Sequence, residues 1–185
     1  ELSSAVIGYQ ANAQQQHYLG ALNTIRSQGI TVADLSILLN HNDNSSLVFE
    51  KKDTHWSLDG AKAAAKVVAN EIEKLGLAKL DSQATFETVY TGVKRDVGSI
   101  ERAVSQICGF GITPSFLPAY STVEKLDQQS EFSLFDDVSK DIVLLGSSFS
   151  ALPKYNFDGF IREYSNNDVV SYALSGGGII GSWVN

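Results

Sequence analysis

The stretch KKDTHWSLDGAK, residues 51–62, places an acid, a histidine and a tryptophan side by side, immediately before an alanine-rich segment. Asp53 and His55 are two positions apart, so on an extended or turn segment both side chains project to the same side. A carboxylate that hydrogen-bonds a histidine fixes its tautomer and prepares the ring to act as a general base. The structural alternative is that Asp53 and Ser57 cap the following helix and that His55 is incidental.

A candidate nucleophile follows the apolar run 141–145, which is typical of a strand buried on both faces. The segment Gly146-Ser-Ser-Phe-Ser150 comes directly after it and is similar to the nucleophile elbow, although Ser150 stands where that motif has its last glycine. Ser148 is the predicted nucleophile, because it stands at the serine position of that motif. The amides of a following helix can then hold the oxyanion. Serines before helices are more often N-caps, the role we assign to Ser147 and Ser150.

The elements that must position these residues indicate an α/β fold. The run 141–145 and a second strand-like run, 169–174, flank a helical pattern in which apolar residues recur at i, i+3, i+4 and i+7: Phe157, Phe160, Ile161 and Tyr164. Strand, helix and strand in this order form a βαβ unit, which implies parallel strands with a right-handed crossover. Ligands bind at the carboxyl ends of such strands, where the serine segment and the glycine-rich loop 175–178 fall.

The remaining elements are predicted from periodicity and composition. We expect helices over 13–27, from Ser57 to about Gly76 and around 100–107; strands over 30–35, 47–49 and 83–90; a loop over 41–46; and an irregular connection over 109–135. No internal repeat or composition break is visible, so residues 1–185 are expected to form one domain.

Composition excludes several classes of function. The net charge of −7 argues against a binder of nucleic acid or of an anionic membrane. The single Cys108 rules out an internal disulfide, and neither a His-x-x-x-His pair nor a cysteine cluster offers a metal site, so no metal or cofactor is expected. His17 and His41 lack a partnering motif and are expected on the surface. The chain opens without an initiator Met or signal-peptide pattern, and we expect it to be a fragment.

Asp53-Thr-His-Trp56, followed by Asp59-Gly-Ala61 and later by Gly146-Ser-Ser-Phe-Ser150, resembles the AlgJ/AlgX family, the SGNH-hydrolase-like alginate O-acetyltransferases of the bacterial periplasm. The stretch 152–160, LPKYNFDGF, is also similar, and the resemblance extends from about residue 13 to the end of the chain. It implies a three-layer SGNH-hydrolase-like fold with a mostly parallel sheet. The order of motifs is permuted, because the acid and the histidine precede the serine. A later strand of the fold is expected to be missing, so that the domain is C-terminally incomplete.

The resemblance implies a role for each motif residue. Ser148 would be the nucleophile, His55 the general base and Asp53 the carboxylate that orients it. Gly176 or Gly177 would offer a backbone N–H to the oxyanion.

Three further residues are implied to bind substrate: Trp56, Tyr155 and Asn156. A tryptophan in this position is more often a core residue than a platform for a sugar, and that alternative stays open for Trp56.

The implied activity is transfer of an acetyl group through an acetyl-serine to hydroxyls of an exopolysaccharide such as alginate. A membrane-bound acyltransferase would donate the acetyl group, and other exopolysaccharide-assembly proteins are expected partners. The alternatives are a carbohydrate acetylesterase with the same triad and a non-catalytic polysaccharide-binding or assembly module. Because a net charge of −7 would not attract the alginate polyanion, either the acceptor is neutral or nearby cations form a positive rim: Lys51, Lys52, Lys154 and Arg162.

Overall fold

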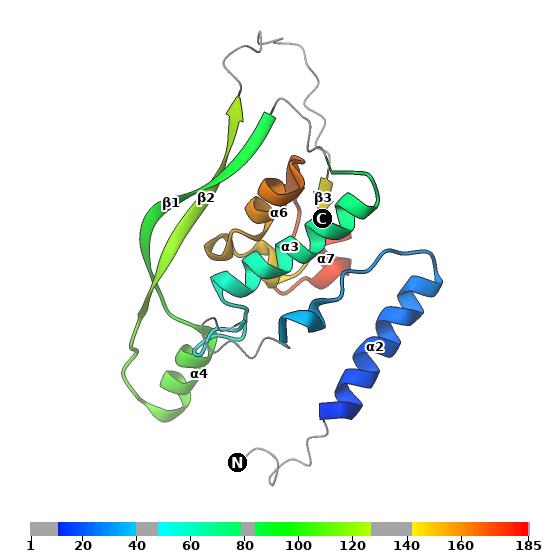
Figure 1. The fold of residues 1–185 in the computed structure, drawn as a ribbon. Coiled ribbons are helices and arrows are strands. Elements are labelled where there is room, and N and C mark those ends of the chain that lie inside the picture. The colour runs from blue at the N-terminus through cyan, green and yellow to red at the C-terminus, as the bar shows by residue number, and fades with distance from the viewer. Residues whose placement is uncertain (1–10, 40–47, 79–83, 127–141, 185) are drawn as a thin grey trace. The chain divides into compact units, whose positions relative to one another are not determined.

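The computed structural model describes residues 11–39, 48–78, 84–126 and 142–184. The chain divides into two compact units, Glu1–Asp34 and Leu35–Asn185. The first contains α2, Ala11–Ser27, which confirms the helix predicted over 13–27 (Figure 1). His17 is exposed on it, as expected, whereas His41 and the predicted loop 41–46 lie outside the described residues.

The strand predicted over 30–35 is wrong. Residues 30–34 form no regular element, and Leu35–Leu39 is a short 3-10 helix, η1. None of the described strands pairs with this segment. A β-branched run forms a strand only where neighbouring strands and side chains support it, because strand propensity mainly reflects packing on a pleated surface.

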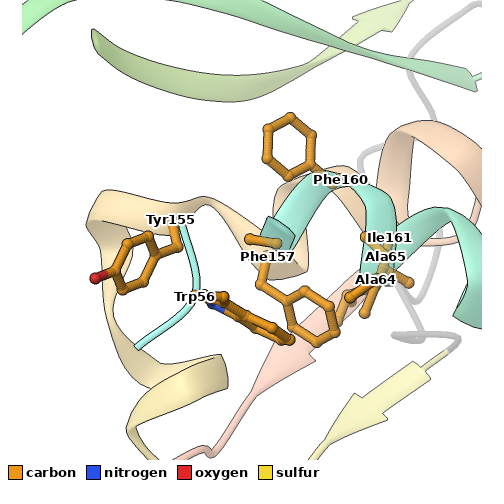
Figure 2. Packing of buried hydrophobic residues seen from close by; sticks show 9 residues of the cluster. Trp56, Ala64, Ala65, Tyr155, Phe157, Phe160 and Ile161 are labelled. Atoms are coloured by element: carbon orange, nitrogen blue, oxygen red, sulfur yellow. The ribbon is translucent and has the colours of Figure 1, made fainter. Parts of the chain in front are cut away.

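The hydrophobic core of the second unit lies between α3, Leu58–Lys74, and α6, Phe157–Ser165. Ser57 caps α3 by accepting a hydrogen bond from the Gly60 amide at 3.0 Å, and Gly76, at φ 69°, follows its end, as predicted. Small side chains on α3 let the larger side chains of α6 approach closely (Figure 2). The fully buried members of this contact are Ala61, Ala64 and Ala65 from α3 and Phe160 and Ile161 from α6.

The predicted βαβ unit is confirmed, with shorter strands than expected. Strand β3, Ile142–Leu144, pairs in parallel with β4, Val169–Ser171, and α6 connects them. Backbone hydrogen bonds extend the pairing past the strands, since the Leu174 amide donates to the Gly146 carbonyl at 2.9 Å. The segment that carries Ser148 therefore begins at the carboxyl end of a parallel pair, where the sequence placed it.

A long antiparallel ladder makes the second sheet. Strand β1, Ala84–Asp96, extends the strand predicted over 83–90. Strand β2, Ser115–Leu126, lies within the stretch 109–135 that was expected to be irregular, of which residues 127–135 lie outside the described part. Pro118 obscured this strand in the sequence, but proline is tolerated on an edge strand, and both strands of a two-stranded sheet are edges. The mostly parallel sheet is thus not seen among the described strands, because the longer ladder is antiparallel.

Helices α4, Ser99–Cys108, and α7, Gly178–Val184, also belong to the second unit. Helix α4 lies between β1 and β2 in the chain and confirms the helical pattern around 100–107. Helix α7 follows the glycine-rich loop. The short strand predicted over 47–49 is reduced to a single bridge between Phe49 and Trp56, with Leu47 outside the described residues. Within the described ranges, no helix has both the length and the apolar character that crossing a bilayer requires.

The α3–α6 contact should dominate the stability of this unit. Phe160 is 2% exposed in the core, whereas Phe110 is 67% exposed. We expect Phe160→Ala to lower the free energy of unfolding by about 3–5 kcal/mol, because the change removes apolar contacts and leaves a cavity. The same substitution at Phe110 should change it by less than about 0.5 kcal/mol. Urea unfolding followed by circular dichroism measures both; equal losses would contradict this account of the core.

Candidate active site

The structure brings the three predicted catalytic side chains into one hydrogen-bonded chain. His55 Nδ1 lies 2.7 Å from Asp53 Oδ1, and His55 Nε2 lies 2.9 Å from Ser148 Oγ. A carboxylate only accepts hydrogen bonds, so the Nδ1 proton is donated to Asp53 and Nε2 is left to accept the serine proton. This is the arrangement that lets a histidine act as a base toward a serine hydroxyl.

The Asp53–His55 segment is held by the backbone on both sides and by Trp56. The Glu50 amide donates to the His55 carbonyl at 3.1 Å, and Phe49 and Trp56 form an antiparallel bridge. The Trp56 ring enters the core directly after His55, so the turn cannot move without disturbing the core (Figure 2). Of the two residues that could have capped α3, only Ser57 does so, because the Asp53 carboxylate bonds His55.

Asp53 is buried, with 6% of its surface exposed, yet both of its oxygens are fully engaged. Oδ1 accepts from the Thr54 amide at 2.7 Å and from Ser99 Oγ at 2.8 Å, in addition to His55. Oδ2 accepts from Lys154 Nζ at 2.8 Å. Burial alone would raise the pKa of Asp53, but the hydrogen bonds from Lys154, His55 and Ser99 outweigh it and hold that pKa well below its usual range.

Lys154 connects Asp53 to a second carboxylate. Its Nζ also lies 2.9 Å from Asp96 Oδ2 and 4.9 Å from the centre of the Tyr155 ring. Burial favours the neutral amine, but the hydrogen bonds to Asp53 and Asp96 prevail and raise the pKa of Lys154 above its ordinary value. Lys154 is therefore a fixed cation behind the acid of the triad.

The serine turn is fixed by its glycine and by α7. Ser148 begins the short helix α5, Ser148–Ala151, and the Ser147 carbonyl accepts from the Ser150 and Ala151 amides. A Cβ at Gly146 would lie 2.8 Å from Ser150 Oγ, so a larger residue here would require the Ser150 side chain to move. Ser182 Oγ of α7 donates to the Gly146 carbonyl at 2.6 Å.

The glycine-rich loop lies beside this turn. Ser175 lines the same cavity as Ser148, whereas the Gly177 amide donates to the Leu174 carbonyl at 3.1 Å. Gly176 has a φ of 81°, a conformation that favours glycine. Oxyanion binding by Gly176 or Gly177 stays a prediction, and the Gly177 amide would have to leave its turn to take part.

A cavity of about 540 Å³ lies next to the triad. Its lining includes His55, Ser148, Ser175, Lys154, Arg102 and Gln106. A second cavity of about 370 Å³ shares Arg102 with the first. In the described ranges, no group of histidines, cysteines and carboxylates is arranged to hold a metal ion.

The three residues expected to bind substrate all make contacts within the fold. Trp56 is 9% exposed and packs against Phe149 and Phe157, so neither face of its ring is open to a sugar. Tyr155 is fully buried, and burial raises its pKa to about 12. Asn156 adopts a left-handed conformation, φ 48°, before α6, and its side-chain amide donates to Thr122. Each side chain therefore has contacts that stabilise the fold around the site, and a role for any of them in binding substrate stays a prediction.

The proposed positive rim is largely neutralised by the chain itself. Lys52 lies 3.4 Å from Glu101, and Arg162 bonds the Val169 carbonyl and lies 3.6 Å from Asp168. Sequence patterns missed three polar residues that line the cavity: Asp96, Ser99 and Arg102. None of them lies beside a recognisable motif, and Lys154 was expected only as part of the positive rim.

The fold is that of an SGNH hydrolase-like domain. Residues 4–185 match the family described as "SGNH hydrolase-like domain, acetyltransferase AlgX", and the chain belongs to that family. The resemblance that the two motifs suggested is therefore confirmed.

The similar proteins act in alginate biosynthesis by name. The chain is 30% identical over 172 residues to the alginate biosynthesis protein AlgX of Pseudomonas aeruginosa, with 92% of this chain and 36% of that protein covered. It is 32% identical over 135 residues to a probable alginate O-acetylase AlgJ of Pseudomonas fluorescens, covering 72% of this chain and 34% of AlgJ. The chain thus spans about a third of the length of these relatives.

Two solved structures are similar in fold. AlgX of P. aeruginosa aligns with a TM-score of 0.75 and 28% identity, covering 92% of this chain and 38% of AlgX. The O-acetyltransferase domain of Pseudomonas putida AlgJ aligns with a TM-score of 0.72 and 24% identity, covering 90% of this chain and 56% of the AlgJ chain. The expected SGNH-like fold class is confirmed at this level.

The Asp53 carboxylate should make stability depend on pH. Its pKa is lowered by folding, so its contribution is fully present above the ordinary carboxyl pKa of about 3.9 and is lost as the pH falls toward the folded value. Below about pH 4, the free energy of unfolding of the parent should therefore fall more steeply than that of Asp53→Asn, by up to roughly 1.4 kcal/mol per pH unit. Urea titrations at several pH values test this; parallel pH curves would contradict it.

Proposed function

We propose that this domain transfers an acetyl group through an acetyl-serine at Ser148 to hydroxyls of a bacterial exopolysaccharide. The observation that carries the proposal is the continuous chain from Asp53 through His55 to Ser148, with distances of 2.7 and 2.9 Å. The names of the relatives, an alginate biosynthesis protein and a probable alginate O-acetylase, favour alginate as the acceptor.

The first half-reaction acetylates the serine. His55 Nε2 takes the proton of Ser148 Oγ as the oxygen attacks the carbonyl carbon of the donor, and the Asp53 carboxylate stabilises the imidazolium that results. The tetrahedral oxyanion is held by the Ser148 amide at the start of α5 and by an amide of the glycine-rich loop. The intermediate then collapses, the bond to the donor breaks, and His55 returns its proton to the leaving group.

The second half-reaction moves the acetyl group to the acceptor. A sugar hydroxyl enters the cavity, loses its proton to His55 and attacks the acetyl carbonyl. When the second tetrahedral intermediate collapses, the bond to Ser148 Oγ breaks and His55 protonates that oxygen. The triad is thereby restored, and no metal or cofactor takes part in either step.

Hydrolysis competes with this second step. The cavity lined by His55 and Ser148 is large enough, at about 540 Å³, to admit water as well as a sugar, so an acetylesterase is the second candidate function. A binding or assembly module is a weaker candidate, because a buried, fully hydrogen-bonded Asp53 beside a histidine and serine has no evident use in it. Acetate release with and without an acceptor oligosaccharide separates transferase from esterase.

The donor and the compartment are part of the same proposal. We expect a membrane-bound acyltransferase to deliver the acetyl group and other exopolysaccharide-assembly proteins to bring the acceptor, in the periplasm. The relatives' place in alginate biosynthesis supports this arrangement.

Acetylation of Ser148 is the direct test. Incubation with p-nitrophenyl acetate should add one acetyl group to the parent, and peptide mapping should place it on Ser148. Ser148→Ala should gain none. The matched control is Ser147→Ala, whose hydroxyl makes no capping hydrogen bond and should be dispensable. Intact mass spectrometry on folded proteins measures all three; an adduct that persists in Ser148→Ala would overturn the proposed nucleophile.

The acid of the triad is expected to accelerate the same step. Asp53→Asn should slow acetylation by roughly 10²–10⁴-fold, because an asparagine neither fixes the histidine tautomer nor stabilises the imidazolium. The rate of p-nitrophenolate release in the first turnover measures the loss. A rate within about threefold of the parent would show that Asp53 only stabilises the fold.

Arg102 is the cation best placed to meet an anionic acceptor. Its guanidinium is anchored on the Val97 carbonyl at 2.8 and 3.2 Å, and it lines both cavities. We expect Arg102→Gln to raise KM for an oligouronate about 10–100-fold, the loss of one charge-assisted hydrogen bond, while acetylation of Ser148 is unchanged. A neutral β-1,4-glucan oligosaccharide serves as control. Equal effects on both acceptors would exclude recognition of a carboxylate by Arg102.

A further inference from the structure

The outer oxygen of Asp53 is bonded to an ammonium group. Lys154 Nζ lies 2.8 Å from Asp53 Oδ2 and 2.9 Å from Asp96 Oδ2. The side chains of Lys154 and Asp96 are 21% and 20% exposed, and that of Asp53 is 5% exposed. Three charges, negative, positive and negative, therefore lie in a row behind His55.

Three separate elements supply this row. Asp53 belongs to the turn before α3, Asp96 is the last residue of β1, and Lys154 lies in the 3-10 helix η2, Pro153–Tyr155. The Tyr155 side chain is fully buried next to it, which fixes the backbone that carries the lysine. Such convergence holds the ammonium in place instead of leaving it free to follow a ligand.

The row has the net charge of a single carboxylate. Asp53 and Lys154 alone would sum to zero and would stabilise an imidazolium on His55 poorly. Asp96 restores one negative charge, so the lysine can orient Asp53 without cancelling the field that His55 requires. Lys154 also bonds Oδ2, while Ser99, Thr54 and His55 share Oδ1, so the plane of the carboxylate is fixed from both sides.

We propose that Lys154, anchored by Asp96, is a positioning residue of the triad: it fixes the Asp53 carboxylate so that Oδ1 faces His55. The proposal rests on the proposed function of Ser148 and His55. Direct contact of Lys154 with substrate is the competing role. It is disfavoured because two carboxylates already take the ammonium, which also lies over the Tyr155 ring.

The test compares Lys154→Met with Asp96→Asn in the acetylation of Ser148 by p-nitrophenyl acetate. Lys154→Met should lower the maximal rate about 10–100-fold with KM unchanged within about twofold, since a misplaced catalytic group costs rate and not binding. Lys154→Arg keeps the charge and should recover part of the rate. A raised KM at an unchanged maximal rate would overturn the proposal in favour of substrate contact.

The pH dependence of the acetylation rate distinguishes a positioning role of Lys154 from a merely structural one, which would leave that dependence unchanged. The charged or titratable groups near His55 are Asp53, Lys154, Asp96, Arg102, Glu50 and Tyr155. Lys154→Met leaves two carboxylates and should move the acid limb of the rate profile up by about half a pH unit or more. Asp96→Asn leaves a neutral pair and should move it down. The double variant should return the limb toward the parent position while the rate stays low.

A measurement that needs no turnover keeps this proposal distinct from the proposed function. In the parent, the His55 Nδ1 proton should give a strongly downfield ¹H NMR resonance, assigned by its absence in His55→Gln. Lys154→Met should shift this resonance upfield or broaden it, with the fold confirmed by circular dichroism. If the parent is not acetylated but the resonance responds to Lys154→Met, the proposed function fails and the positioning role stands. An unchanged resonance, or acid limbs that move in the same direction in both single variants, would refute the positioning role.

Discussion

Burial of the Asp53 carboxylate is the constraint on which the rest of the site depends. An ionised carboxylate removed from water costs several kcal/mol unless charges and hydrogen bonds compensate it. Asp53, 6% exposed, is compensated by His55, Thr54, Ser99 and Lys154. Because removal of any of these donors leaves a buried charge underpaired, the geometry that orients the histidine is also required for the stability of the fold around it.

The end of the antiparallel ladder is joined to the site through the backbone next to this carboxylate. Where β1 ends and α4 begins, the Ile100 and Glu101 amides donate to the Lys52 carbonyl at 3.1 and 3.2 Å. Gly98 lies so close to that carbonyl that a Cβ would not fit. This contact carries Ser99 to Asp53 and places the Arg102 side of α4 along the cavity. Helix α4 and the end of β1, both outside the βαβ unit, thus form one wall of the site.

The sequence predicted those features that depend on residues close together in the chain. The α3 and α6 helices and the parallel strand pair follow from periodicity and capping, and the structure confirms them. The Asp53–His55 and Ser148 motifs follow from short sequence patterns, and the structure brings their side chains within hydrogen-bonding distance. Partners of Asp53 that are distant in the chain, such as Ser99 and Lys154, leave no periodic signal. The prediction of an irregular connection failed where β2 forms, because glycine and proline are typical of loops. The cross-strand pairing with β1 overrides that local preference and cannot be seen in the local sequence. Trp56 shows the same limit, since its burial is decided by α6 and α5 and not by its neighbours in the motif.

The charge of the whole chain is a poor guide to the acceptor. A net charge of −7 opposes a polyanion at long range, but salt screens exposed charges beyond about 8 Å at physiological ionic strength. At shorter range, the attraction of an anionic acceptor depends on where the individual cations lie. Lys52 and Arg162 are paired with acids of the chain, and Lys154 is taken up by Asp53 and Asp96. Among the described residues that line the cavity, Arg102 is the cation whose guanidinium is anchored on a neutral carbonyl. It is therefore available to attract the carboxylate of the proposed acceptor into the cavity that Ser148 also lines.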